Sequence, residues 1–130
     1  MDICKILKES KTIAVLGISS NPIRTSRAIA QYLINADYKV VGVNPGTPKI
    51  DGIEVFASLK DIPFEIDIVD VFRRAEDIPE IIEDVLSIKP KVLWLQLGIR
   101  NDDAVAPCIQ NEITVIQDKC IKIEHSMCSS

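Results

Sequence analysis

The segment TIAVLGISSNPIRTSRAIAQYLINA, residues 12–36, decides the fold class of this 130-residue chain. Residues 12–17 form an almost wholly apolar run that ends at a glycine, which is typical of a buried strand. After Ser-Ser-Asn-Pro, apolar side chains recur at helical spacing and give a helix one face for packing on a sheet: Ala28, Ile29, Tyr32, Leu33 and Ala36. The segment therefore predicts a strand followed by a crossover helix.

The rest of the chain repeats this alternation of apolar runs and helical stretches. We expect further strands at 39–43, 66–72, 92–97 and 113–117, and a minor edge strand at 53–56. Strands that alternate with helices need crossover connections, and such connections make the strands parallel. The prediction is an α/β fold, a three-layer Rossmann-like doubly wound sheet with about five parallel strands and helices on both faces.

Three further helices belong to this prediction. A helix around residues 78–86 has a single apolar face, and Pro79 suits its first turn. Asn101 is a suitable N-cap for the next helix. Because Pro107 removes a backbone donor inside that helix, we expect it to be short, bent or split. A final short helix is expected at 119–125.

Composition limits the class of protein. A chain of 130 residues with a hydrophobic fraction of 47% can form one domain, residues 1–130, with its own core. The formal net charge of -4 argues against nucleic-acid binding, which needs a broad basic surface. No apolar run approaches the roughly 20 residues of a membrane-spanning helix, and the N-terminus is unlike a signal peptide. We therefore expect a cytoplasmic protein that binds neither nucleic acid nor a membrane.

The cysteines and the single histidine give no metal or catalytic pattern. Cys4, Cys108, Cys120 and Cys128 contain no C-x-x-C pair, so reduced thiols are the simplest expectation. Cys120 follows the last predicted strand and is expected to lie closest to a ligand bound at the strand ends. His125 lies near the C-terminus with no obvious nucleophile beside it, so we predict a structural role for it.

Polar residues gather where the predicted strands end. Residues 17–21 follow the first strand, 44–45 the second, 73–74 the third and 98–101 the fourth. Taken singly, these are ordinary loop residues. In an open parallel sheet, however, ligands bind beyond the carboxyl ends of the strands, where such loops converge. Their joint placement predicts a ligand site at that edge.

The first loop has the attributes of a phosphate-binding loop. Gly17 lets a ligand approach the backbone, small hydroxyl residues follow, and the helix start offers free N–H groups to an anion. Arg24 and Ser26 could add a charged and a neutral donor. An alternative is that Thr25 or Ser26 simply caps the helix, and capping is compatible with phosphate binding.

The identity of the nucleotide follows from what the loops lack. Gly17 is followed by no second or third glycine at the spacing of the dinucleotide fingerprint G-x-G-x-x-G. An NAD site usually has an acid at the end of the second strand, where this chain has Asn44 and Pro45. An adenosine with an extra ribose phosphate would be repelled by an acid and tolerates asparagine. The sequence therefore favours coenzyme A or NADP over NAD.

Residues after the third and fourth strands extend the predicted site. Arg73 can pair with phosphate oxygens, whereas Arg74 is expected to be a solvated surface charge. Phe72 either offers an apolar face to adenine or belongs to the core. Gln96 alternates with Trp94, so we expect Gln96 at the ligand edge and Trp94 in the core.

Together these motifs resemble the stand-alone coenzyme A-binding domain family, small relatives of the nucleotide-binding domain in the α subunit of succinyl-CoA synthetase. The resemblance covers residues 13–125, and its segments are IAVLGISSNPIRTS, VVGVNPG, DIVDVFRRAEDIP, VLWLQLGIRND and QDKCIKIEH. It implies coenzyme A as the cofactor. Asp37 stands where the family commonly has glycine, but aspartate can adopt the left-handed conformation that ends a helix.

The resemblance also implies which residues contact the coenzyme. Those implied for its phosphates are Gly17, Ile18, Ser19, Arg24 and Ser26. Asn44 and Pro45 are implied to flank the adenosine. Phe72 and Arg73 are implied to form walls of the cleft, and Gln96 and Gly98 are implied to lie along the pantetheine arm.

The predicted function is therefore binding of coenzyme A or an acyl-coenzyme A, without independent catalytic activity. The synthetase forms its phosphohistidine in a second domain that has no counterpart here, so His125 does not inherit that role. The alternatives are an NADP-dependent oxidoreductase and a detached nucleotide-binding subunit of an acyl-CoA synthetase that works with a partner chain. A hydride-transfer enzyme usually needs a second substrate-binding region, for which 130 residues leave little room.

Overall fold

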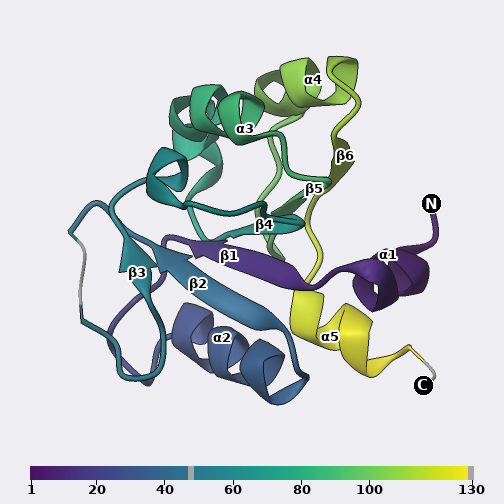
Figure 1. The fold of residues 1–130 in the computed structure, drawn as a ribbon. Coiled ribbons are helices and arrows are strands. Elements are labelled where there is room, and N and C mark those ends of the chain that lie inside the picture. Colours follow the sequence, from purple (N-terminus) through teal and green to yellow (C-terminus); the bar gives the residue numbers. More distant parts are fainter. Residues whose placement is uncertain (47–48, 129–130) are drawn as a thin grey trace.

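Residues 1–46 and 49–128, the part of the chain that the computed structural model describes, contain a six-stranded sheet in the order β3-β2-β1-β4-β5-β6 (Figure 1). Every pair of neighbouring strands is parallel. The strands are β1 (Thr12–Leu16), β2 (Lys39–Val43), β3 (Val55–Phe56), β4 (Ile68–Val71), β5 (Val92–Leu95) and β6 (Thr114–Ile116). The parallel α/β prediction is confirmed, and the minor edge strand is the two-residue β3.

Helices cover both faces of the sheet, as predicted. α3 (Ile82–Ile88) and α4 (Asp102–Gln110) lie on one face, and α2 (Thr25–Asn35) and α5 (Ile121–Ser126) lie on the other, with α1 (Ile3–Glu9) beside α5 (Figure 1). Each face has its own apolar core. The chain builds β1 to β3 in one direction and then places β4 on the other side of β1. In doubly wound sheets, ligands bind at such a reversal.

Two side chains of the central strands are wholly buried. Trp94 is core, as predicted, and its Nε1 donates to the Lys119 carbonyl oxygen over 2.8 Å. Asp70 is also 0% exposed, and its carboxylate has no hydrogen-bond partner among the described residues. Burial raises the pKa of Asp70 well above its ordinary value, because a low dielectric disfavours the charged form.

Proline changes the helices in ways that the sequence prediction captured only partly. Pro79 does not begin an α-helix but lies in a 3₁₀ helix, η2 (Ala75–Ile81), that precedes α3; a shorter one, η1 (Leu59–Asp61), follows β3. α4 is short, as expected, but the possibility of a split helix is wrong, because its nine residues run unbroken through Pro107. The carbonyl that Pro107 leaves without a donor belongs to Asp103, which is exposed to water.

Other local expectations are confirmed. The Asn101 side chain accepts a hydrogen bond from the Ala104 N–H at the start of α4, and Asp37 has a φ of 74° just after α2.

Among residues 1–46 and 49–128, the structure contains no helix that is both long and apolar enough to cross a membrane.

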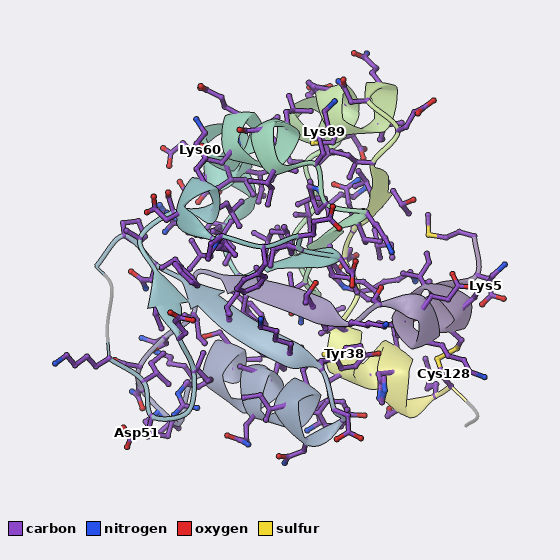
Figure 2. All side chains as sticks on the ribbon, viewed as in Figure 1. Lys5, Tyr38, Asp51, Lys60, Lys89 and Cys128 are labelled. Atoms are coloured by element: carbon purple, nitrogen blue, oxygen red, sulfur yellow. A yellow bond between two sulfur atoms is a disulfide. The ribbon has the colours of Figure 1, made fainter. Side chains whose placement is uncertain are left out.

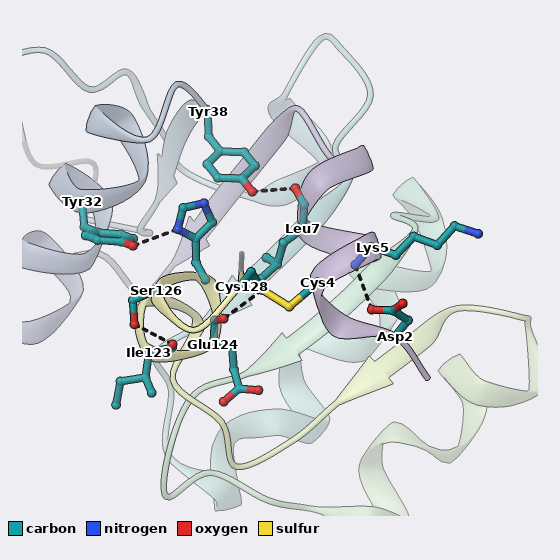
Figure 3. The surroundings of a disulfide bond; sticks show 11 residues. Asp2, Cys4, Lys5, Leu7, Tyr32, Tyr38, Ile123, Glu124, Ser126 and Cys128 are labelled. Atoms are coloured by element: carbon teal, nitrogen blue, oxygen red, sulfur yellow. Dashed lines mark hydrogen bonds between the residues drawn. A yellow bond between two sulfur atoms is a disulfide. The ribbon is translucent and has the colours of Figure 1, made fainter. Parts of the chain in front are cut away.

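The two ends of the described chain are covalently joined. Residues 1–11 gave no helix prediction, yet they contain α1, whose N-cap Asp2 accepts a hydrogen bond from the Lys5 N–H. Cys4 near the start of α1 forms a disulfide with Cys128 just after α5 (Figures 2 and 3). The expectation of reduced thiols is wrong for this pair, because packing of α1 beside α5 brings their Cα atoms to 5.5 Å. Cys108 and Cys120 are free.

Candidate ligand-binding site

A cavity of about 590 Å³ opens at the carboxyl ends of β1 and β2, beside the start of α2. We call it the β1 cavity. Its lining comes from the β1–α2 loop, the first turn of α2, the loop after β2 and the end of β4: Gly17, Ile18, Ser19, Ser20, Arg24, Thr25, Ser26, Asn44, Gly46 and Phe72. Because β1 and β4 flank the reversal of strand order, the cavity lies where this fold is expected to bind a ligand.

Gly17 permits the sharp turn that starts the cavity. Its φ is 90°, and a Cβ atom there would lie 2.8 Å from the Phe72 carbonyl oxygen. Any other residue would therefore clash with the backbone after β4 and would be strained as well. The Gly17 N–H donates to the Val43 carbonyl oxygen, which fixes the turn against β2.

Ser26 holds the loop rather than capping the helix. The N-cap residue of α2 is Arg24, and no side chain caps this end, so the capping alternative for Thr25 or Ser26 is wrong. The buried Ser26 Oγ instead accepts a hydrogen bond from the Ser19 N–H over 3.0 Å. No side chain therefore caps the first-turn N–H groups of α2 at the edge of the cavity, although the Arg27 N–H bonds to the Arg24 carbonyl oxygen.

Asn44 and Ile18 also fix the shape of the loops that line the cavity. Asn44 Nδ2 donates to the Ile18 carbonyl oxygen over 2.9 Å, and Asn44 Oδ1 accepts from the Gly46 N–H over 2.8 Å. The Ile18 side chain is wholly buried, and a Cβ atom on Gly42 would lie 2.7 Å from its Cγ2. Asn44 thus ties together the two loops that line the cavity, and Ile18 offers the cavity its backbone.

The β1 cavity favours an anion. Arg24 is the one charged residue in its described lining, and no carboxylate belongs to that lining. Arg24 is exposed, so its guanidinium is free to move toward a ligand. Together with the positive end of the α2 dipole, it makes the cavity suitable for phosphate groups.

A second, more apolar cavity of about 640 Å³ lies beside the first, at the carboxyl ends of β4 and β5. We call it the β5 cavity. Half-buried Phe72 and exposed Thr25 line both cavities and so form their boundary. The other residues of its lining come from the loops that follow β4, β5 and β6 and from the start of η2: Arg73, Arg74, Ala75, Glu76, Gln96, Leu97, Gly98, Ile99 and Cys120.

The two arginines after β4 differ, as the sequence prediction proposed. The exposed Arg74 Nε pairs with Glu76 at 3.2 Å and with Asp77 at 3.1 Å, which confirms that it is a surface charge. Arg73 packs its side chain toward Gly17, and its buried Nε has no hydrogen-bond partner among the described residues. Arg73 therefore has unused donor capacity beside the cavities.

Gln96 is fixed in the wall of the β5 cavity. Only 4% of the residue is exposed, and its Oε1 accepts a hydrogen bond from the Ile121 N–H over 3.1 Å. Its Nε2 has no hydrogen-bond partner among the described residues, although the residue lines the cavity. An oriented amide with an unused donor in a largely apolar wall is suited to a ligand carbonyl.

Most residues predicted for the site lie together. Six of the predicted residues line only the β1 cavity, three others line only the β5 cavity, and Phe72 lines both. Pro45 lines neither; it borders a cavity of about 210 Å³ together with Gly17 and Arg73. Sequence reasoning included Ser20 and Ile99 in the predicted loops without assigning them a contact. It missed other lining residues, because a loop pattern does not show which neighbours face inward: Gly46, Ala75, Glu76 and Leu97.

His125 lies at the opposite end of the sheet. Its Nδ1 is 2.8 Å from the Tyr32 hydroxyl, and its ring stands edge-on to the rings of Tyr32 and Tyr38. Figure 3 shows these two tyrosines near the Cys4–Cys128 disulfide. In the described part of the chain, no group of three or more His, Cys, Asp or Glu side chains could hold a metal ion.

Comparison with known sequences identifies a family and a close relative. The family described as "CoA binding domain" matches residues 11–126. The uncharacterized protein YneT of Bacillus subtilis is 40% identical over 126 residues, which cover 97% of this chain and 93% of that protein.

Several solved structures are also similar to the chain. The Thermus thermophilus protein cell-free ID.343 is 34% identical with a TM-score of 0.92, over 97% of this chain and 98% of its own. A hypothetical protein of Pyrococcus horikoshii is 30% identical with a TM-score of 0.91, over 96% and 88%. A dinucleotide forming acetyl-coenzyme A synthetase of Ca. Korarchaeum cryptofilum, 18% identical with a TM-score of 0.72, shares the fold over 88% of this chain and 27% of its own.

Proposed function

Because the chain belongs to the CoA-binding domain family, we propose that it binds coenzyme A or an acyl-coenzyme A, without independent catalytic activity. The observation that carries this proposal is the pair of adjoining cavities, because the linings of the two cavities differ in polarity. The first suits phosphate and the second is more apolar, and coenzyme A joins a phosphorylated nucleotide to a long, weakly polar thiol arm.

The diphosphate of the coenzyme belongs in the β1 cavity under this proposal. The turn at Gly17 lets the diphosphate approach the backbone, the start of α2 supplies N–H groups, and Arg24 supplies a mobile positive charge. Asn44 and Ser26 act by holding the two loops in place, since their side-chain oxygens already accept backbone hydrogen bonds.

The pantetheine arm belongs in the β5 cavity. Leu97 and Ile99 offer apolar surface, and Gln96 Nε2 is available to one amide carbonyl of the arm. The ring of Phe72 lies between the two cavities, where the arm leaves the diphosphate. The small domain holds both parts of the ligand at one edge of the sheet.

Calorimetry with a panel of coenzyme A, acetyl-CoA, NAD, NADP and FAD tests this function. We expect the two coenzyme A compounds to bind at least about tenfold more tightly than NAD, a difference of about 1.4 kcal/mol. Tighter binding of NADP would favour the oxidoreductase alternative. Equal or tighter binding of NAD would overturn the proposal.

Two substitutions test the position of the phosphates. Arg24→Ala removes a charge-assisted contact and should weaken coenzyme A binding by roughly 1.5 to 3 kcal/mol at unchanged folding stability. Ser26→Ala should weaken binding and also cost about 1 kcal/mol of stability, because the Ser19 N–H loses its acceptor.

Arg100→Ala is the matched control for Arg24→Ala. Arg100 is another exposed arginine at this edge, where it pairs with Asp102, and it lines neither cavity. The Arg100→Ala substitution removes the same charge as Arg24→Ala and should leave the affinity for coenzyme A nearly unchanged. Wild-type affinity in Arg24→Ala would exclude the first loop as the phosphate site and favour the Arg73 side of the cleft.

A further inference from the structure

We infer that Cys120 is an attachment site for coenzyme A, at which the β5 cavity presents the coenzyme's sulfur for disulfide exchange. The inference rests on the proposed function, because the bound nucleotide is what delivers the sulfur to the cavity. It goes beyond that function by adding a reversible covalent state of the same complex.

The structure fixes Cys120 in the cavity through its two neighbours. The Lys119 carbonyl oxygen accepts a hydrogen bond from Trp94 Nε1 over 2.8 Å, and the Ile121 N–H donates to Gln96 Oε1 over 3.1 Å. Trp94 and Gln96 belong to the same stretch of chain, at and just after β5, and both are buried. The half-buried thiol therefore has a firmly held backbone and an opening toward the cavity.

Gln96 points independently to a ligand in this cavity. It is 96% buried, its Oε1 is held by α5, and its Nε2 lacks a partner among the described residues. Among the described residues, Gln96 Nε2 is not one of the buried atoms that lack a partner, so this donor is accessible from the cavity and available to a ligand acceptor. The amide carbonyls of a pantetheine arm are such acceptors, and the sulfur lies at the end of that arm. Gln96 and Cys120 thus line one cavity, with complementary roles.

The other cysteines do not offer this arrangement. Cys108 is 0% exposed, and burial raises the pKa of its thiol, which keeps it protonated and out of reach. Cys4 and Cys128 are joined to each other and line a different cavity, together with His125. Cys120 is the free thiol of the described chain that borders the β5 cavity.

The exchange uses coenzyme A disulfide, a symmetrical disulfide of two coenzyme molecules, and it balances without a further oxidant. The Cys120 thiolate attacks one sulfur of the disulfide and forms a Cys120–coenzyme A bond. The original sulfur–sulfur bond breaks, and the second coenzyme leaves as a thiolate, which takes up the proton that Cys120 lost. One disulfide is consumed and one is formed, so the reverse reaction with free coenzyme A restores the thiol.

The experiment compares coenzyme A disulfide with glutathione disulfide, which lacks the nucleotide. Wild-type protein with its Cys4–Cys128 bond closed is mixed with each disulfide, and the adduct is followed by intact mass and located by peptide mapping. Nucleotide binding raises the local concentration of the reacting sulfur. We therefore expect coenzyme A disulfide to react at least about tenfold faster, on Cys120.

Matched variants separate a bound reaction from simple thiol exposure. Arg24→Ala should slow the reaction with coenzyme A disulfide by about the factor by which it weakens coenzyme binding. Arg100→Ala, whose residue lines neither cavity, should leave the rates with both disulfides unchanged. Cys120→Ser should form no adduct, whereas Cys108→Ser should react like the wild type. Peptide mapping of the wild type decides the site even if a variant fails to fold.

The outcomes distinguish this inference from the proposed function. Equal rates with the two disulfides, or an adduct on Cys4, Cys108 or Cys128, overturn the inference. If calorimetry of the wild type with reduced coenzyme A still shows binding in that case, the proposed function stands. If calorimetry shows no binding, the proposed function fails, and the inference fails with it.

Discussion

The two ends of the parallel sheet use their polar groups in opposite ways. At the amino end, polar groups pair with one another: Asp67 accepts hydrogen bonds from the N–H groups of Lys11 and Thr12, and the Tyr38 hydroxyl donates to the Leu7 carbonyl oxygen over 2.6 Å. At the carboxyl end, donors are left over, notably Gln96 Nε2 and Arg73 Nε. The named polar groups at the amino end are thus paired within the protein, whereas those at the carboxyl end keep donors for a ligand.

This difference separates stability from binding. The buried Arg73 Nε at the carboxyl end costs folding free energy while it lacks a partner, and a ligand acceptor would offset that cost. The amino end offsets such costs with hydrogen bonds, ion pairs and the disulfide. We therefore expect substitutions at the amino end to lower stability without changing coenzyme A affinity.

The largest effect should come from opening the disulfide. The Cys4–Cys128 bond closes a loop with a sequence separation of 124 residues, so it restricts the unfolded chain strongly. In the chain-entropy account, its loss in the double variant Cys4→Ser/Cys128→Ser should cost roughly 3 to 5 kcal/mol of unfolding free energy. Denaturant unfolding measures this cost, and calorimetry should find unchanged coenzyme A affinity.

A reductant provides the control for that variant. It should lower the unfolding midpoint of the wild type and leave that of the double variant unchanged. An unaltered midpoint in the reduced wild type would mean that the amino end does not depend on the bond. A large loss of affinity in the double variant would mean that the two ends are coupled.

The disulfide also illustrates what sequence patterns can predict. Strands and helices follow from local periodicity, and the convergence of loops at 17–21 and 98–101 follows from the topology of a parallel sheet. The Cys4–Cys128 pair instead depends on α1 packing beside α5, a tertiary fact with no short spacing motif.

The role of a side chain within a predicted site is harder still. Ser26 occupies a position where a cap is plausible, yet its hydroxyl is taken by Ser19, seven residues back. Asn44 was expected beside adenosine, and its side-chain amide forms hydrogen bonds with the backbone of Ile18 and Gly46. Sequence reasoning located the loops but could not assign these hydrogen bonds, because each depends on how two loops approach one another.

A moderate effect is expected from Asp67→Asn at the amino end. Burial raises the pKa of Asp67, but the N–H groups of Lys11 and Thr12, and Lys91 at 3.4 Å, outweigh it and lower the pKa below its ordinary value. A lowered native pKa means that the carboxylate stabilises the fold above its unfolded pKa, and that this is lost as pH falls through the native pKa. The variant should lose roughly 1 to 2 kcal/mol at pH 7.

Unfolding measured at several pH values checks the sign. The difference between wild type and Asp67→Asn should shrink as the pH falls toward 3. Asp70→Asn is the opposing control, because burial raises the native pKa of Asp70, and the wild type therefore loses stability as pH rises above the unfolded value of about 3.9. The free energy of unfolding of the Asp70→Asn variant should therefore rise relative to that of the wild type as the pH rises. Parallel curves for both variants would contradict the assignment.

The smallest effect on binding is expected from His125→Ala. His125 lies with Tyr32 and Tyr38 at the amino end, away from both cavities, so coenzyme A affinity should stay within about twofold of wild type. Stability should fall by about 1 kcal/mol, since the hydrogen bond to Tyr32 and the edge-on ring contacts are lost. Tyr32→Phe is the matched control, because it removes the hydrogen bond and keeps the ring. If the wild type acquires an acid-labile phosphate from ATP and His125→Ala does not, the histidine has a chemical role, and the amino end of the sheet is not merely structural.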